Sequence, residues 1–147
     1  MVINISPKKT QFDKKLIEQY RNECIISNYD GSQCEKAHII PWTMCVKLGF
    51  NDIAFDYSNG LILLKGIHNS FEIENGRSPN ISFEIIEQKE DYLKCKLIVG
   101  SRKYTKKLLE NTYANKEIFI NPKSKSFINL HKYIFDISNT GKSNVVF

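Results

Sequence analysis

Hydrophobic residues recur at helical spacing near both ends of the chain. Residues 11–23 place Phe12, Leu16, Ile17 and Tyr20 on one helical face, with charged residues between them. The stretch FINLHKYIFDI near the C-terminus repeats the same spacing. The pattern therefore predicts an amphipathic helix at the start of the chain and another towards its end.

Short apolar runs bounded by turn residues predict strands in the first half. The runs are CIIS at 24–27, CEKAHII at 34–40 and LILL at 61–64. An Asp-Gly pair separates the first two runs, and an Asn-Gly pair precedes the third. Pro41 ends the second strand, because proline cannot donate a hydrogen bond to a neighbouring strand.

A short helix is predicted directly after the LILL strand. Residues 66–76 carry Ile67, Phe71 and Glu72 on a helical period, and Asn75-Gly76 is a typical helix stop. Further on, ISFEIIE and YLKCKLIVG flank the polar sequence QKED and predict an antiparallel hairpin. The segment 103–122 fits a helix or a strand equally well. These elements together predict an α+β fold.

The composition is that of a globular protein in one domain. The chain has 147 residues, 41% of them apolar, which is enough for one core spanning residues 1–147. Its net charge of +5 has the sign that a phosphate-binding protein needs. Lysine-rich surfaces are also common in chains from AT-rich genomes, so the charge is supporting evidence only.

The cysteines and the N-terminus favour an intracellular, cytoplasmic protein. Cys24, Cys34, Cys45 and Cys95 are irregularly spaced and form no CxxC pair, so buried thiols are favoured over a zinc site or disulfides. The first residues lack the apolar core of a signal peptide, and no run is long enough to cross a bilayer. We therefore expect no membrane partner.

The candidate chemistry lies between residues 34 and 76. His38 falls near the end of a predicted strand, and Asn59 falls in the turn before the next one. His68 and Glu72 are four residues apart, which places both on one face of the predicted helix. An imidazole and a carboxylate in that arrangement can hold one divalent cation. These ligands suit Mg²⁺, Mn²⁺, Zn²⁺ or Ni²⁺ better than a soft metal.

The sequences AHIIPW and DYSNG, followed by His68 and Glu72, resemble the His-Asn-His (HNH) endonucleases. This family is also called the ββα-metal or His-Me finger nucleases, and the restriction-endonuclease-like branch is the most similar. The resemblance covers residues 20–80. It implies a ββα-metal core at about residues 34–76, flanked by an N-terminal helix and by a C-terminal β-hairpin plus helix.

The resemblance also implies a reaction, in which a divalent metal assists the hydrolysis of phosphodiester bonds in DNA. His38 would be the general base, Asn59 would fix the loop that orients it, and His68 with Glu72 would hold the metal. Mg²⁺ is the expected ion, with Mn²⁺, Ni²⁺ and Zn²⁺ as alternatives. Many family members carry Asp or His directly before the base as a further ligand. Here that position is Ala37, so water and phosphate would complete the coordination.

Double-stranded DNA is the expected partner, and a homodimer would match a palindromic site. The residues expected to contact DNA are Arg77, Arg102, Lys103, Lys106 and Lys107. A second basic group, Lys8, Lys9, Lys14 and Lys15, lies near the start of the chain. Either basic group could equally be a solvated face.

Other interpretations remain open for each feature and for the whole chain. A strand histidine, a His–Glu pair on a helix and an Asn-Gly turn each occur commonly without catalytic roles. Within the family, the alternative is a non-specific or nicking nuclease of phage, toxin or homing type. Outside enzymes, the alternative is a catalytically silent DNA-binding module with the same fold.

Overall fold

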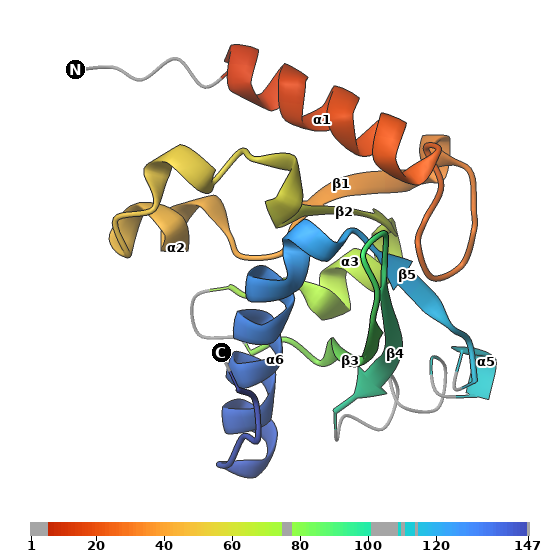
Figure 1. The fold of residues 1–147 in the computed structure, drawn as a ribbon, viewed down its shortest axis with the longest axis vertical. Coiled ribbons are helices and arrows are strands. Elements are labelled where there is room, and N and C mark those ends of the chain that lie inside the picture. The colour runs from red at the N-terminus through yellow and green to blue at the C-terminus, as the bar shows by residue number, and fades with distance from the viewer. Residues whose placement is uncertain (1–5, 75–77, 101–108, 110, 114, 147) are drawn as a thin grey trace.

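The computed structural model describes residues 6–74, 78–100, 109, 111–113 and 115–146, and they form a fold of mixed helix and sheet (Figure 1). The described helices are α1 (Ser6–Tyr20), α2 (Trp42–Lys47), α3 (Lys65–Phe71), α5 (Asn111–Tyr113) and α6 (Lys125–Thr140). The described strands are β1 (Cys34–His38), β2 (Gly60–Leu64), β3 (Ile81–Gln88), β4 (Leu93–Val99) and β5 (Ile118–Ile120). This mixture agrees with the predicted α+β class.

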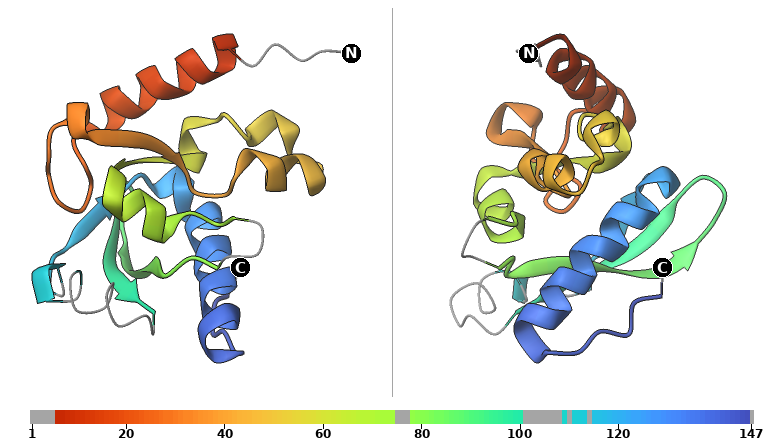
Figure 2. Two further views of the ribbon diagram at one scale, coloured as in Figure 1. Left: turned by 180° about the vertical axis from the view of Figure 1, so that it is seen from behind. Right: turned by 90° about the vertical axis from the view of Figure 1, so that its left-hand side faces the viewer.

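An antiparallel hairpin of β1 and β2 carries the first half of the fold. Its register runs from the pair Cys34–Leu64 to the pair His38–Gly60. The apolar side chains of β2 are buried because α1 covers one side of the hairpin and α3 lies on the other (Figures 1 and 2). Strand, strand and helix follow in the order that a ββα core requires, so the arrangement is consistent with that prediction.

Helix α1 packs tightly against the hairpin at Gly60. A Cβ atom at this position would lie 2.6 Å from the ring of Phe12 and 2.8 Å from Leu16. Any larger residue would therefore push α1 away from β2. Gly60 is the cross-strand partner of His38, so its lack of a side chain also brings Phe12 close to the imidazole.

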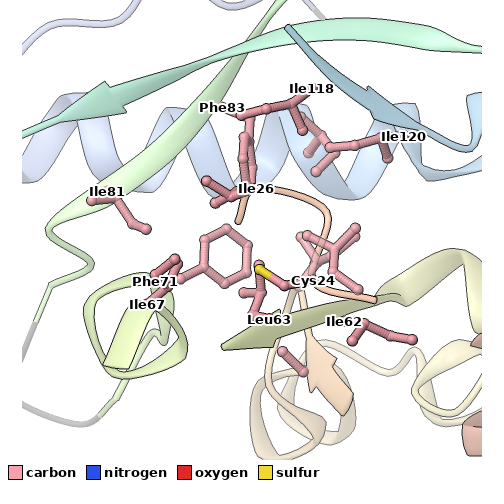
Figure 3. Close-up of a cluster of buried hydrophobic side chains, with 14 of the residues drawn as sticks. Cys24, Ile26, Ile62, Leu63, Ile67, Phe71, Ile81, Phe83, Ile118 and Ile120 are labelled. Atoms are coloured by element: carbon pink, nitrogen blue, oxygen red, sulfur yellow. The ribbon is translucent and has the colours of Figure 1, made fainter. Parts of the chain in front are cut away.

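The second half forms an antiparallel sheet in the order β3-β4-β5, with α6 packed along it. The predicted hairpin is β3 and β4, and the predicted C-terminal helix is α6. Strand β5 lies in the segment whose pattern fitted helix and strand equally. The main core fills the space between this sheet and the β1–β2 hairpin, where Leu63, Phe71 and Phe83 are fully buried (Figure 3).

The prediction of a strand at residues 24–27 is wrong, because this segment forms a tight turn. The N–H of Asn28 donates to the carbonyl of Cys24, and Asn28 adopts a left-handed backbone with φ of 64°. The N–H of Ile25 donates one backbone hydrogen bond to the carbonyl of Ile62 in the hairpin. Cys24 and Ile26 are apolar because their side chains lie in the core, so the run of apolar residues reports burial rather than a strand.

The short helix α3 ends at Phe71 rather than at Asn75-Gly76. Two of its last carbonyl groups are bonded to other parts of the fold. The N–H of Asn80 donates to the carbonyl of Ser70 over 2.7 Å, and Nε2 of His131 donates to that of Phe71 over 2.6 Å. Glu72 then has an extended backbone, with φ of −65° and ψ of 135°. The prediction that Glu72 lies on the helix is therefore wrong.

The four cysteines are free thiols with buried side chains, as the irregular spacing indicated. Burial raises the pKa of the Cys95 thiol to about 12, so this group stays protonated at neutral pH. Within the described part of the chain, no helix combines the length and apolarity needed to span a bilayer.

Candidate active site

Asn59 ties the loop that follows β1 to the start of β2. Its side chain is fully buried, and its oxygen accepts a hydrogen bond from the N–H of Ile40 over 2.9 Å. Its amide nitrogen donates to the carbonyl of Ile40 over 3.0 Å and to that of Ala54 over 3.3 Å. One side chain therefore fixes both ends of the segment between β1 and β2. Asp56 caps the turn before Asn59 by accepting from the N–H of Ser58, as its position in the sequence DYSNG predicted.

The imidazole of His38 is held at the end of β1 by this same segment. The backbone of Ala54 lies beside the ring and acts to raise the pKa of His38. Nε2 of the ring is buried and has no hydrogen-bond partner within the described residues. A neutral imidazole carries a lone pair on one of its two nitrogens, so a neutral His38 is able to accept a proton.

Two aromatic rings pack against His38. Phe12 of α1 is stacked on the imidazole, with 4.6 Å between ring centroids and 11° between planes. Phe55 meets it edge-on, at 5.1 Å and 84°. Burial, helped by the nearby positive charge of Lys9, lowers the pKa of His38 to about 4. The ring is thus neutral at pH 7, as a general base must be.

His68 lies within electrostatic reach of His38, because a positive charge on its ring would lower the pKa of His38. Its closest described polar contact is with Glu35 of β1, where His68 Nδ1 and Glu35 Oε1 are 3.1 Å apart. This contact joins residues 33 positions apart in the chain, from β1 and α3.

Glu72 lies just beyond α3 and lines a hollow with residues of α2. The hollow has a volume of about 250 Å³, and its walls include Pro41, Met44 and Lys47. Because the helix ends before Glu72, the one-face argument for joint metal binding by His68 and Glu72 no longer holds. The role of Glu72 as a ligand stays a prediction.

The described residues contain no cluster of three or more His, Cys, Asp or Glu side chains suited to a metal. The chemistry of His68 nevertheless fits a metal ligand. Its Nδ1 is engaged by a carboxylate, which leaves Nε2 to coordinate, and this is the usual arrangement of a ligating histidine. Mg²⁺ and Mn²⁺ tolerate such sparse protein ligation, because Mg²⁺ keeps several waters and accepts substrate phosphates.

Basic side chains lie beside the imidazole on the α1 side. A hollow of about 360 Å³ shares the rings of Phe12 and Phe55 with His38. Its charged lining residues are Lys8, Lys15, Asp52 and Asp56. The predicted DNA contacts Arg77, Arg102, Lys103, Lys106 and Lys107 lie outside the described residues. Lys8 and Lys15 belong to the second predicted basic group.

Comparison with known proteins bears on the segment that carries these residues. Residues 24–74 match the family model for HNH endonuclease. The matched segment covers less than half of the chain, and it contains His38, Asn59, His68 and Glu72. No curated protein and no solved structure matches the chain. Over this segment the chain is similar to HNH endonucleases, a similarity that suggests nuclease activity.

Three features of this HNH-like site were missed by sequence reasoning. Phe12 and Phe55 were treated only as apolar residues, although their rings enclose the imidazole of His38. Ala54 contributes through its carbonyl group, which no side-chain pattern can reveal. Glu35 offered one signal, since it precedes Ala37 by two positions and therefore shares its face of β1.

Proposed function

We propose that this chain is a metal-dependent DNA endonuclease of restriction type, in which His38 takes a proton from the attacking water. A single HNH domain over residues 1–147 and a homodimer on a symmetric DNA site are parts of the same proposal. The carrying observation is the place of His38, whose ring lies beside Ala54 in the loop that Asn59 fixes and whose buried Nε2 has no described hydrogen-bond partner. The match to the HNH endonuclease family supports the reaction class.

The reaction requires two groups at the site, a general base and a cation. Phosphodiester hydrolysis needs removal of a proton from water and stabilisation of charge on the phosphoryl oxygens. His38 Nε2 accepts the proton. Asn59 holds the carbonyl of Ala54 in place beside the ring of His38, where it would stabilise the imidazolium formed in the reaction. A bound divalent cation, with His68 and Glu72 as its proposed protein ligands, would neutralise negative charge on the scissile phosphate.

Access of water to His38 requires a local movement. Nε2 is enclosed in the structure, so a covering side chain must shift before water can reach it. Phe12 and Phe55 are the aromatic groups against the ring, and Phe12 is carried by α1. DNA that binds along the hollow beside these rings would meet them before it meets the imidazole.

Plasmid cleavage tests the proposal. The wild-type chain should linearise or nick supercoiled DNA in Mg²⁺ or Mn²⁺, and His38→Ala should abolish cleavage while DNA binding in a filter or mobility-shift assay is retained. His131→Ala is not a suitable control, because that residue is a buried structural group. Ser58→Ala is the better control, because this serine lies in the same loop and has no proposed role in the reaction.

The products discriminate between the candidate functions. Discrete bands support a restriction-type enzyme, a smear supports a non-specific nuclease, and accumulation of open circles supports a nicking enzyme. An intact plasmid across Mg²⁺, Mn²⁺, Ni²⁺ and Zn²⁺ would instead favour the silent DNA-binding module. Analytical ultracentrifugation with and without duplex DNA tests the homodimer.

A further inference from the structure

The contact between Glu35 and His68 links the two elements on which the proposed site depends. His68 lies on α3 and Glu35 on β1, and their side chains approach to 3.1 Å between Oε1 and Nδ1. The imidazole is mostly buried, at 16% exposure, whereas Glu35 is 42% exposed. A carboxylate that is half exposed gains little from an ion pair alone. Its contact therefore suggests a role other than stabilisation.

The chemistry of the contact fixes the protonation pattern of His68. A carboxylate is only an acceptor, so Nδ1 of the imidazole must carry the hydrogen and donate it. In the neutral ring the lone pair then resides on Nε2. A carboxylate behind a ligating histidine also raises the basicity of the ring and holds its orientation.

The position of Glu35 follows from the strand. Alternate residues of β1 point to the same side, so Glu35 and Ala37 share the face of the hairpin that meets α3. Ala37 has no group that could contact a cation. Glu35 is the carboxylate on this face of β1, two residues away, and its side chain is long enough to reach the ring of His68.

We propose that Glu35 is a positioning residue for His68. Its carboxylate accepts the Nδ1 hydrogen and so presents Nε2 of His68 to the divalent cation. This inference rests on the proposed function, because it assumes that His68 is a metal ligand. It assigns no direct contact between Glu35 and the metal.

Metal affinity provides the first test, measured as Mn²⁺ binding by electron paramagnetic resonance. Loss of a carboxylate behind a ligating histidine typically weakens metal binding by about 10- to 100-fold. Glu35→Ala should fall in this range, and Glu35→Gln should lose less, because its amide oxygen can still accept the hydrogen bond. Glu84→Ala is the matched control, since Glu84 is 41% exposed and ion-paired with Lys96 on the other sheet. It should bind Mn²⁺ as the wild type does.

The tautomer of His68 provides a second test that a purely structural role would not affect. In ¹⁵N-detected NMR of the metal-free protein, the ring should show hydrogen on Nδ1, with assignment by His68→Gln. Glu35→Ala should shift the population towards hydrogen on Nε2. An unchanged tautomer would overturn the inference whatever happens to metal affinity, because Glu35 would then act on the metal directly or not at all.

A third variant separates failure of this inference from failure of the proposed site. If His68→Ala binds Mn²⁺ as tightly as the wild type, His68 is not a ligand and the proposed metal site falls. If His68→Ala loses binding while Glu35→Ala does not, only the positioning role of Glu35 falls. Loss in both, with normal binding by Glu84→Ala, supports the inference.

Discussion

The ring of Phe12 is stacked on the imidazole of His38, with 4.6 Å between centroids. Phe12 is fully buried and belongs to α1, which lies outside the segment that matches the HNH family. The environment of the proposed base is therefore completed by a helix that the family match does not include. Stacking and burial keep water from the imidazole, and burial is the main reason for its lowered pKa.

Phe12→Leu should move the acid limb of the pH–rate profile upwards. A smaller, non-aromatic side chain lets water reach the ring, so the pKa of His38 should rise from about 4 towards its ordinary value of 6.5. The wild type should keep its kcat/KM as the pH falls from 7 to 5, whereas the variant should lose activity over that range. Superimposable profiles, from proteins shown by circular dichroism to be folded, would contradict this account of the pKa.

Asn59→Ala should reduce both stability and cleavage. The substitution leaves the N–H and carbonyl of Ile40 without their described side-chain partner and frees the Ala54 carbonyl. A loss of about 3 kcal/mol in the free energy of unfolding is expected, since each buried unpaired polar group costs about 1–3 kcal/mol. Urea denaturation measures it.

Asn121→Ala is the matched control for Asn59. The side chain of Asn121 also accepts a hydrogen bond from a backbone N–H, that of Lys123, over 2.9 Å. This turn is partly exposed and lies towards the C-terminus. Loss of such a cap costs about 1 kcal/mol. Equal losses in the free energy of unfolding for the two variants, or full cleavage by Asn59→Ala, would contradict a special role of Asn59 in the loop.

His131 should make the protein less stable in mild acid. This ring is fully buried, its Nε2 donates to Phe71, and Nδ1 accepts from the hydroxyl of Ser82 over 2.7 Å. Burial lowers its pKa from 6.5 to about 4. In the unfolded chain His131 therefore binds a proton below pH 6.5, whereas in the folded chain it does not bind one until the pH falls to about 4. Stability should be greatest above pH 6.5 and fall as the pH approaches 4.

His131→Gln isolates this contribution. The variant should be less stable than the wild type at pH 7, yet its free energy of unfolding should fall less between pH 7 and pH 4. The difference in that fall should be about 3 kcal/mol, from the shift of the pKa of one group. Parallel pH curves for the two proteins would show that His131 titrates normally in the fold.

The two lysines beside the His38 rings should contribute to DNA binding. Replacing Lys8 and Lys15 together with alanine should lower the slope of log K against log salt by about 2, since each phosphate contact contributes about 0.9. The control is Lys89→Ala with Lys96→Ala, because both lysines are ion-paired with glutamates on the β3–β4 sheet. An equal fall in both double variants would indicate a general effect of charge.

The sequence predicted those elements whose signals are local. The period of Phe12 and Leu16 predicted α1, and the turn residues around Asn59 predicted the connection to β2. The place of His38 at the end of a strand was also predicted correctly. Each of these features depends on residues only a few positions apart in the chain. Hydrophobic periodicity and turn residues report on structure over that distance.

The errors concern residues whose positions depend on distant partners. The end of α3 was misplaced because His131 and Asn80 bond its last carbonyl groups, and neither is visible in the pattern around Glu72. The run at 24–27 was read as a strand because burial in a turn and burial in a strand select the same residues. The pairing of Glu35 with His68 requires the hairpin register, which fixes which face of β1 meets α3.

The most direct test of the proposed base is chemical rescue of His38→Gly. Removing the imidazole leaves a space between Phe12 and Phe55 that free imidazole can enter. Cleavage by the variant should be lost and then restored by millimolar imidazole, with no effect of imidazole on the wild type. If His38→Gly cuts DNA at the wild-type rate, or stays inactive with imidazole while folded and bound to DNA, His38 is not the base.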